Sequence, residues 1–334
     1  MNGNTKIVVI GLGGVAQLVH LPILSKIKSV KIAAVSELNK TRLKTIAEKF
    51  NVKEKYTDYK EMLNHVEFDA AIISTPTNTH KQIAIDCLNS GKDVLVEKPI
   101  ALSYQEAKEI DDAAKKNKRK VMVGMNFRFR PDAMMLKSLI NSGELGDIFY
   151  IKCGWARKQS SNQKWFNKKN LSGGGVLLDL GIVLLDTALW LLDFPKIKNV
   201  TSQNFSHTRQ TVEDSSVGLI RFNSNAVLNY EVSWSVQDET DKFRLSAFGK
   251  EGAGYLNPLK AYKKVDSTKV DYTLNSRAEQ KNLFRKSYEN EIKHFIGAIK
   301  DSIPLISSSE EALFRMKLIE NLYQSAKNKS EINF

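Results

Sequence analysis

The sequence of 334 residues contains only two cysteines, Cys87 and Cys153. Two thiols cannot build the disulfide framework of small secreted domains, and their spacing matches no metal-binding motif. The first apolar run, Ile7–Ile10, has the length of a strand and not that of a secretory signal. We therefore expect a cytoplasmic protein with no metal site.

Long uncharged apolar runs, internal repeats and low-complexity tracts are also missing. The most apolar stretch, Gly175–Leu192, carries Asp179 and Asp186, and two carboxylates argue against a membrane span. Apolar residues make up 42% of the chain and charged residues 26%, as in ordinary globular proteins. The length suffices for two domains with a large core. Because the most apolar stretch carries two carboxylates, we expect no membrane partner.

Acidic residues are fewer than basic ones, 37 against 50, which gives a formal net charge of +13. The basic residues are dispersed, and the densest run, Lys115–Lys120, falls where a helix is expected to end, a place that suits cations. Because no basic face is interleaved with aromatic residues, we expect no nucleic-acid partner. A positive field would attract phosphorylated cofactors or acidic substrates.

A glycine-rich loop follows the first predicted strand, Lys6–Ile10, and opens a helix. This order of strand, loop and helix is that of the G-x-G-x-x-A dinucleotide fingerprint. The first glycine permits a tight turn, the second lets a pyrophosphate approach the backbone, and the helix N-terminus faces the phosphates. The predicted cofactor contacts of this loop are Gly11, Leu12, Gly13, Gly14, Val15 and Ala16.

The second predicted strand, Lys31–Val35, ends at Ser36 and Glu37. An acidic side chain at this point accepts hydrogen bonds from the adenosine ribose and repels a 2′-phosphate, which favours NAD over NADP. Ser36, Lys40 and Arg42 are close enough to offer phosphate contacts, so NADP remains an alternative. A merely exposed glutamate in a turn is the other interpretation of Glu37.

Two further strand ends carry polar residues. The strand Asp69–Ile73 is followed by a segment whose small hydroxyl residues suit the approach of a flat cofactor, with Thr75, Pro76, Asn78 and His80 as predicted contacts. Asn78 could equally cap the helix 79–89, and His80 could be a structural histidine. The strand Asp93–Val96 ends in Glu97, Lys98 and Pro99. Ligands bind at the carboxyl ends of such strands, so we place Lys98 over the reacting atoms of a redox site.

Six predicted strands alternate with helices up to Val123, which describes a complete doubly wound α/β domain over residues 1–123. Residues 124–334 change character. Long runs of alternating apolar and polar residues predict a second, α+β domain with an open, mostly antiparallel sheet, covered on one face by the apolar helix Gly174–Leu192. We expect this domain to bind substrate and to form a homodimer or homotetramer through the sheet, because Tyr230, Trp234, Phe243 and Phe248 suggest an incompletely covered face.

The covering helix places Asp179, Val183 and Asp186 on one face. Three glycines just upstream, Gly173–Gly175, are expected to allow close approach of a ligand, which favours a site role for Asp179. For Asp186 a structural hydrogen bond is the preferred interpretation. The preceding segment contains Trp155, which could stack on a sugar or base, and Arg157, which could pair with a phosphate. A polar surface loop without a ligand is an equally good interpretation of this segment.

Taken together, these motifs resemble those of the Gfo/Idh/MocA oxidoreductases over essentially the whole chain. The matching segments are GLGGVA at 11–16, STPTNTH at 74–80, EKP at 97–99, NFRFRP at 126–131 and GGGVLLDLGIVLLD at 173–186. The resemblance implies a Rossmann domain and reversible NAD(P)-dependent oxidation of a hydroxyl on a sugar, cyclitol or nucleotide-sugar. It also implies that Lys98 bonds the reacting oxygen, that Glu97 lies near the nicotinamide, and that Asp179 contacts substrate. Asn126 is a further expected cofactor contact.

One residue departs from the family pattern D-x-G-x-H-x-x-D. The position of its histidine, the usual acid/base, is held by Val183, which carries no proton. Three alternatives remain. Lys98 acts as acid/base itself, with Arg128 or Arg157 nearby. Another group replaces the histidine, such as Asp179 through a water, a tyrosine or His207. Or the protein is a weakly active or inactive sensor that binds cofactor and sugar. The predicted substrate-contacting positions are Lys98, Arg128, Trp155, Arg157, Asp179 and Val183.

Overall fold

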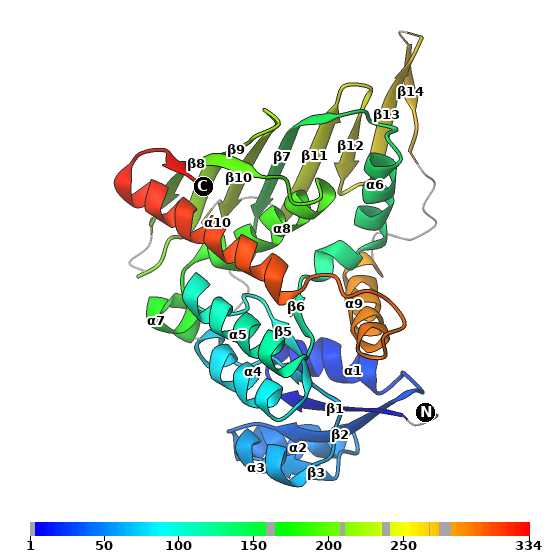
Figure 1. Cartoon of the computed structure of the whole chain (residues 1–334), viewed down its shortest axis with the longest axis vertical. Helices are drawn as coiled ribbons and strands as arrows, with labels where there is room; N and C mark the ends of the chain where they lie inside the picture. The colour runs from blue at the N-terminus through cyan, green and yellow to red at the C-terminus, as the bar shows by residue number, and fades with distance from the viewer. Residues whose placement is uncertain (1–3, 158–163, 208–210, 236–240, 267, 274–281) are drawn as a thin grey trace. The chain divides into compact units, whose positions relative to one another are not determined.

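The computed structural model describes the chain except residues 1–3, 158–163, 208–210, 236–240, 267 and 274–281. The chain folds into two compact units (Figure 1). The first consists of Met1–Met125 together with Tyr288–Phe314, and the second of Asn126–Ser287 together with Arg315–Phe334. The division of the chain into domains at Val123 stays a prediction. In the structure, the later segment Tyr288–Phe314 belongs to the first unit.

The first unit contains a six-stranded sheet whose strands are all parallel, in the order β3-β2-β1-β4-β5-β6. This is the doubly wound order in which a crevice opens at the carboxyl ends of the strands where the order reverses, between β1 and β4. Strands β4 and β5 are buried throughout, and β1 is buried except at Lys6, which explains their runs of valine, isoleucine and alanine. The strands are β1 (Thr5–Ile10), β2 (Val30–Ser36), β3 (Glu54–Tyr56), β4 (Ala70–Ile73), β5 (Asp93–Glu97) and β6 (Val121–Gly124).

Helices of this unit begin at residues that the sequence marks as caps. The Asn39 side chain accepts a hydrogen bond from the Arg42 N–H, and the Ser103 hydroxyl accepts one from the Glu106 N–H, so these two residues are the N-caps of their helices. The helices are η1 (Ala16–His20), α1 (Leu21–Leu24), α2 (Lys40–Lys49), α3 (Tyr59–His65), η2 (Thr77–Thr79), α4 (His80–Asn89), α5 (Tyr104–Asn117) and, from Tyr288 on, α9 (Leu283–Ile299).

The second unit contains a nine-stranded sheet in the order β14-β13-β12-β11-β7-β10-β9-β8-β15. The pair β7–β10 is parallel and the other pairs are antiparallel. The predicted fold class is therefore confirmed, although the sequence analysis did not define the short edge strands. The strands are β7 (Ile148–Ala156), β8 (Ile197–Phe205), β9 (Ser215–Phe222), β10 (Val227–Ser233), β11 (Lys242–Gly249), β12 (Gly252–Leu256), β13 (Lys260–Val265), β14 (Thr268–Asp271) and β15 (Ile332–Asn333).

Helices cover one face of this sheet (Figure 1). The apolar run Lys169–Leu191 is long and apolar enough to cross a membrane by composition, yet 94% of its apolar window is buried inside the protein, as in a core helix. It consists of α7 (Lys169–Ser172), the π-helical turn η5 (Leu177–Gly181) and α8 (Ile182–Leu191), and α8 packs on β7 and β10. The unit also contains η3 (Asn126–Phe129), α6 (Pro131–Asn141), η4 (Lys164–Asn167) and most of α10 (Ser309–Asn328).

A buried ion cluster joins three helices of the second unit. The Arg128 guanidinium donates two hydrogen bonds to the Asp186 carboxylate, at 2.6 and 2.8 Å, and Arg315 donates one at 2.8 Å. All three side chains are at most 2% exposed. Asp186 thus has the structural role that the sequence analysis preferred. Arg128 is committed to the same cluster, which argues against the substrate contact predicted for it.

The face of the sheet opposite α8 carries a row of aromatic side chains. Tyr150 stacks on Phe248 with ring centroids 5.5 Å apart, and Tyr255 contacts both Phe248 and Tyr262 at 6.0 Å. These four residues, one each from β7, β11, β12 and β13, are called the outer aromatic row below. Of the residues predicted for this face only Phe248 belongs to it, because Tyr230 and Phe243 are buried on the helix side and Trp234 contacts Asp179.

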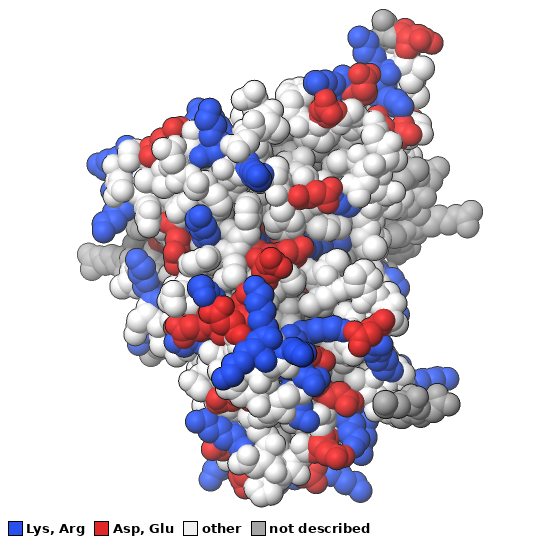
Figure 2. All heavy atoms as spheres, in the orientation of Figure 1, with Lys and Arg blue, Asp and Glu red and all other residues white. Residues whose placement is uncertain are grey.

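Charged side chains are mixed on the surface. Lysines and arginines lie beside aspartates and glutamates on the face in view (Figure 2), and several form exposed pairs such as Lys108–Asp112 and Lys250–Asp147. Such a mixture is typical of a solvated surface.

Candidate active site

The glycine-rich loop turns sharply after β1. Gly11 has a positive φ of +88°, and a Cβ atom there would lie 2.7 Å from the Ser74 carbonyl oxygen, so only glycine fits. The Gly11 N–H donates to the Ser36 carbonyl oxygen, and the Ser74 hydroxyl donates to the Gly11 carbonyl oxygen, both at 2.8 Å. Around Gly14, by contrast, a Cβ atom would meet nothing within 4 Å. The loop is therefore fixed at its base and open at its tip, as a dinucleotide pyrophosphate requires.

Glu37 is tied to this loop. Its Oε2 accepts a hydrogen bond from the Leu12 N–H at 3.0 Å, its Oε1 accepts one from the Asn39 N–H at 2.9 Å, and Arg42 lies 3.2 Å from Oε2. Only 10% of the Glu37 side chain is exposed, so it is not the exposed turn residue of the alternative interpretation. A carboxylate held beside the loop is placed to accept hydrogen bonds from ribose hydroxyls.

The segment after β4 continues the same edge of the sheet. Thr75 is half-buried, and Pro76 and Asn78 are exposed. Asn78 is not the cap of α4, since Thr79 occupies that position and no side-chain cap bond is formed. His80 is buried, and its Nε2 and Nδ1 lie 2.8 and 2.9 Å from the carbonyl oxygens of Thr75 and Pro99. The neutral ring donates from one nitrogen to one of these two carbonyl oxygens, and it packs between the two strand-end loops, which favours the structural role of His80 over the predicted cofactor contact.

Glu97 and Lys98 end β5 next to this segment. Glu97 is buried, its Oε1 lies 2.8 Å from Nε2 of His20, and its Oε2 accepts a hydrogen bond from the Lys98 N–H at 3.2 Å. Burial alone would raise the pKa of Glu97, but the hydrogen bond and charge of His20 and the charge of Lys98 outweigh it and lower that pKa. Glu97 is therefore a carboxylate, and the half-buried Lys98 follows directly from it. The sequence analysis missed His20, whose partner lies far along the chain.

In the second unit, Asp179 lies in the π-helical turn η5 and is 5% exposed. The Trp234 indole N–H donates to its Oδ2 at 3.1 Å, and the Phe166 ring lies 6.0 Å from the Trp234 ring. Val183, one turn further along, is also buried. The sequence analysis assigned Trp234 to the outer face of the sheet, because it predicted a longer strand than β10, which ends at Ser233.

The glycines before Asp179 serve packing, which corrects the prediction of close ligand approach. A Cβ atom at Gly175 would overlap the Glu213 carbonyl oxygen, and one at Gly174 would overlap the Tyr323 hydroxyl. The Glu213 carboxylate accepts hydrogen bonds from the N–H groups of Gly175 and Leu177 and from the Tyr323 hydroxyl. Burial raises the pKa of both Glu213 and Tyr323. This buried network fixes the helix start and with it the direction of Asp179.

The remaining predicted contacts differ in their surroundings. Trp155 packs against Phe127 with ring centroids 5.0 Å apart, and the Arg157 guanidinium lies 5.8 Å from its ring. Arg157 is 32% exposed and 3.4 Å from Asp241, so it remains accessible. Asn126 is buried and its amide donates to the Ser287 hydroxyl at 2.9 Å, which favours a packing role.

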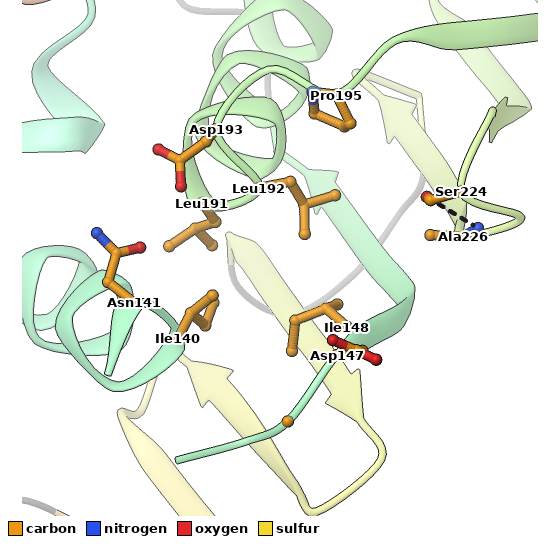
Figure 3. A pocket seen from close by; sticks show the side chains of 11 residues that line it. Ile140, Asn141, Asp147, Ile148, Leu191, Leu192, Asp193, Pro195, Ser224 and Ala226 are labelled. Carbon is orange, nitrogen blue, oxygen red and sulfur yellow. Dashed lines mark hydrogen bonds between the residues drawn. The ribbon is translucent and has the colours of Figure 1, made fainter. Parts of the chain in front are cut away.

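A cavity of about 590 Å³ in the second unit has other chemistry (Figure 3). It lies between the end of α6, the turn after α8 and the start of β7. Its lining contains Asp147 and Asp193, which pair with lysines, and no lysine, histidine or tyrosine among the described residues. The ionisable groups among its described lining residues are thus two carboxylates that are already paired with lysines.

Comparison with known proteins agrees with these geometries. Residues 5–125 match the domain described as the oxidoreductase family, NAD-binding Rossmann fold, and residues 134–254 match the GFO/IDH/MocA C-terminal domain. The chain belongs to the Gfo/Idh/MocA oxidoreductase family. The resemblance seen in the motifs is thus confirmed in both halves of the chain.

Several relatives of this family member are similar along most of their length. D-glucoside 3-dehydrogenase of Escherichia coli (strain K12) is 26% identical, covering 98% of this chain and 97% of that protein. The scyllo-inositol 2-dehydrogenase (NAD(+)) of Bacillus subtilis (strain 168) is 25% identical, covering 95% and 93%. The glucose-6-phosphate 3-dehydrogenase of the same organism is 32% identical over a shorter segment, 64% of this chain and 61% of that protein.

Solved structures show the same fold. Levoglucosan dehydrogenase in complex with NADH and levoglucosan has a TM-score of 0.90 at 20% identity, with 99% of both chains covered. GenD2 from gentamicin A biosynthesis in complex with NAD has a TM-score of 0.88 at 24% identity, covering 99% of this chain and 97% of that one. As a member of this family, the chain is an oxidoreductase with an NAD-binding Rossmann domain.

Proposed function

We propose that this chain oxidises a ring hydroxyl of a sugar or cyclitol, including sugars in glycosidic, phosphorylated or nucleotide-linked form. The observation that carries the proposal is the full-length similarity to a D-glucoside 3-dehydrogenase and a scyllo-inositol 2-dehydrogenase. Both names describe oxidation of a secondary hydroxyl on a six-membered ring. The regulatory sensor considered from the sequence is the less favoured alternative, since these relatives are named as dehydrogenases.

The cofactor is held, in this proposal, by the loop Gly11–Ala16, by Glu37 at the ribose and by Thr75. NAD, when bound, accepts the hydride from the substrate carbon and returns it in the reverse reaction. The open tip of the loop and the anchored Glu37 carboxylate fit this group.

The proton of the hydroxyl is taken by Lys98. Oxidation to a ketone needs a base at the oxygen, and Val183 offers none, whereas an amine can serve as one. Lys98 is half-buried at the end of a rigid strand, and its backbone N–H is bonded to Glu97. Asp179, oriented by Trp234, accepts a hydrogen bond from a second substrate hydroxyl.

The test is optical measurement of NAD reduction with a panel of hexosides, hexose phosphates, nucleotide-sugars and inositols. Turnover that requires one of these rings supports the proposal. Asp179→Asn is expected to raise the KM for that substrate, with the exposed Asp147→Asn as control. Saturable binding of NAD without reduction by any member of the panel would favour the sensor.

Substrate charge is tested at Arg157. Its guanidinium lies over Trp155 and is partly exposed, so we propose that it pairs with a phosphate or carboxylate on an acidic or nucleotide-linked sugar while the indole packs on the ring. Arg157→Ala is then expected to raise the KM for the charged member of a substrate pair. An unchanged KM would contradict the proposed preference for an acidic or nucleotide-linked sugar.

We also propose a homodimer or homotetramer formed through the outer aromatic row. The same sheet also carries a cavity of about 410 Å³ lined in part by Phe205, Val217 and Arg244, and Phe205 and Val217 are each 41% exposed. A second copy of the same face would cover this apolar surface. Light scattering should give a dimeric or tetrameric mass and a smaller one for Phe248→Lys; a monomeric wild type would contradict it. We place the protein in the cytoplasm, since Cys87 and Cys153 are both unpaired and buried.

A further inference from the structure

The Glu37 carboxylate is held by two backbone donors and one side-chain donor. Its Oε2 accepts hydrogen bonds from the Leu12 N–H at 3.0 Å and from the Arg42 guanidinium at 3.2 Å. Its Oε1 accepts one from the Asn39 N–H at 2.9 Å. The Leu12 N–H belongs to the anchored glycine-rich loop, and Asn39 is the N-cap of α2, whereas the Arg42 side chain is 41% exposed. Of these three donors, only Arg42 can leave Glu37 without a change in the backbone.

As it stands, the Glu37 carboxylate has too few open acceptor positions for both hydroxyl groups of a ribose. A carboxylate offers about four lone-pair positions on its two oxygens, and the donors described above fill both positions of Oε2 and one of Oε1. The adenosine ribose of NAD presents two neighbouring donors, the O2′ and O3′ hydroxyls. They can bond to both carboxylate oxygens only after Arg42 has moved away from Oε2.

The surroundings of Arg42 also suit a phosphate at the ribose 2′ position. Arg42 and Lys40 lie in the first turn of α2, and this turn contains no acidic residue. The start of a helix favours anions, and a guanidinium can donate two parallel hydrogen bonds to a phosphate. While Arg42 stays paired with Glu37, its positive charge also offsets the negative charge that would repel the phosphate.

We propose that Arg42 determines the cofactor specificity of this site by competing with the ribose for Glu37. In one arrangement Arg42 leaves Oε2, and the O2′ and O3′ hydroxyls of NAD bond to the carboxylate. In the other arrangement Arg42 stays beside Glu37 and donates to the 2′-phosphate of NADP. The protein therefore binds both cofactors, and Arg42 weakens the binding of NAD while it enables that of NADP. The proposal rests on the function proposed above, in which Glu37 binds the ribose.

Binding of the two cofactors in the absence of sugar tests the proposal. Isothermal titration calorimetry gives the Kd of NAD and of NADP for the wild type and for Arg42→Leu. The variant no longer has an exposed ion pair that NAD must break, and such a pair contributes a factor of at most about five. The Kd of NAD should therefore fall by roughly two- to fivefold. Because the variant also lacks a charged donor for the phosphate, the Kd of NADP should rise by roughly tenfold or more.

Two further variants distinguish competition from a simple loss of positive charge. Glu37→Ser removes the carboxylate for which Arg42 competes, so adding Arg42→Leu to it should no longer strengthen NAD binding. Arg42→Lys keeps the charge without the planar guanidinium and should retain part of the NADP affinity. Lys44→Leu is the matched control, because it removes an exposed cation from the same helix. It should leave the ratio of the two Kd values unchanged.

Fragments of the cofactors separate this inference from the proposed function. Adenosine 5′-phosphate and adenosine 2′,5′-diphosphate differ only in the 2′-phosphate, and their binding does not depend on whether a sugar is oxidised. If no sugar is oxidised, the proposed function fails while these titrations still report on Arg42. A lower Kd for the monophosphate together with a higher Kd for the diphosphate in Arg42→Leu supports the inference. Any other combination of changes, including none, overturns it.

Discussion

The backbone of Glu213 lies where a side chain at Gly175 would have to be. A Cβ atom at Gly175 would overlap the Glu213 carbonyl oxygen, while the Gly175 N–H donates to the Glu213 carboxylate at 3.0 Å. This contact fixes the start of the helical segment that carries Asp179. It is a contact between backbones and leaves no flexible atom that could move aside.

Gly175→Ala is therefore expected to lower the free energy of unfolding by at least about 1–3 kcal/mol, the usual cost of inserting a methyl group into a packed site. Denaturant unfolding measures it. Gly14→Ala is the stability control, because a Cβ atom there meets nothing within 4 Å. Equal stability of the two variants would show that the segment can shift.

Asp186→Asn should be among the most destabilising single changes in the second unit. It would leave the guanidinium groups of Arg128 and Arg315 buried without their shared carboxylate, and breaking a buried ion pair costs about 3–5 kcal/mol. The exposed pair Asp147–Lys250 offers a matched control, since solvent screens this pair and Asp147→Asn should leave the denaturation midpoint nearly unchanged. Similar denaturation midpoints for both variants would contradict a structural role for Asp186.

Glu37→Ser should weaken NAD binding and bring the KM values for NAD and NADP closer together. The change removes the acceptor for the Leu12 N–H and for the ribose, and it releases Arg42 from its ion pair. Hydrogen bonds to a charged group contribute about 1.5–3 kcal/mol, so the KM for NAD should rise roughly ten- to a hundredfold. Steady-state kinetics with both cofactors measure this. Glu48→Ser, at an exposed position on α2, should change neither KM.

Because His80 is buried, we expect the free energy of unfolding to depend on pH. Burial lowers the pKa of His80 below 6.5 despite its two carbonyl partners. Stability from the neutral ring is therefore complete above pH 6.5 and is lost as the pH falls through the lower pKa of the folded state. Urea unfolding of the wild type should show this loss between pH 8 and pH 5, and His80→Gln should show less of it. An equal slope in both proteins would mean that His80 does not contribute.

Local sequence was sufficient for the parts of the fold that depend on short spacing. The strand, glycine loop and helix start at Lys6–Ala16 and the polar residues at the end of β5 are all predicted from neighbouring residues in the chain. The prediction of the aromatic face was wrong because Phe243 and Phe248 lie five positions apart in one strand. Side chains at an odd spacing point to opposite faces of a sheet. Both could not lie on the outer face.

Contacts between distant segments could not be predicted in this way. Gly175 packs against Glu213, Arg128 pairs with Asp186 and His20 bonds Glu97, 77 residues away. From the sequence, Gly175 and Arg128 were interpreted as ligand-binding residues and His20 was overlooked. The sequence alone does not show which distant residue packs against or bonds to each of them. Tertiary packing decides between a site and a structural contact.

The most direct test of the account is the kcat of Lys98→Ala. With saturating NAD and the sugar or cyclitol that the wild-type enzyme oxidises, kcat for oxidation should fall by about 10²–10⁴-fold, the usual contribution of a positioned acid/base. The KM for NAD should stay within about twofold of the wild-type value, and the exposed control Lys53→Ala should keep full activity. A Lys98→Ala enzyme that retained nearly all of its kcat would contradict proton transfer by Lys98 and leave the fold untouched.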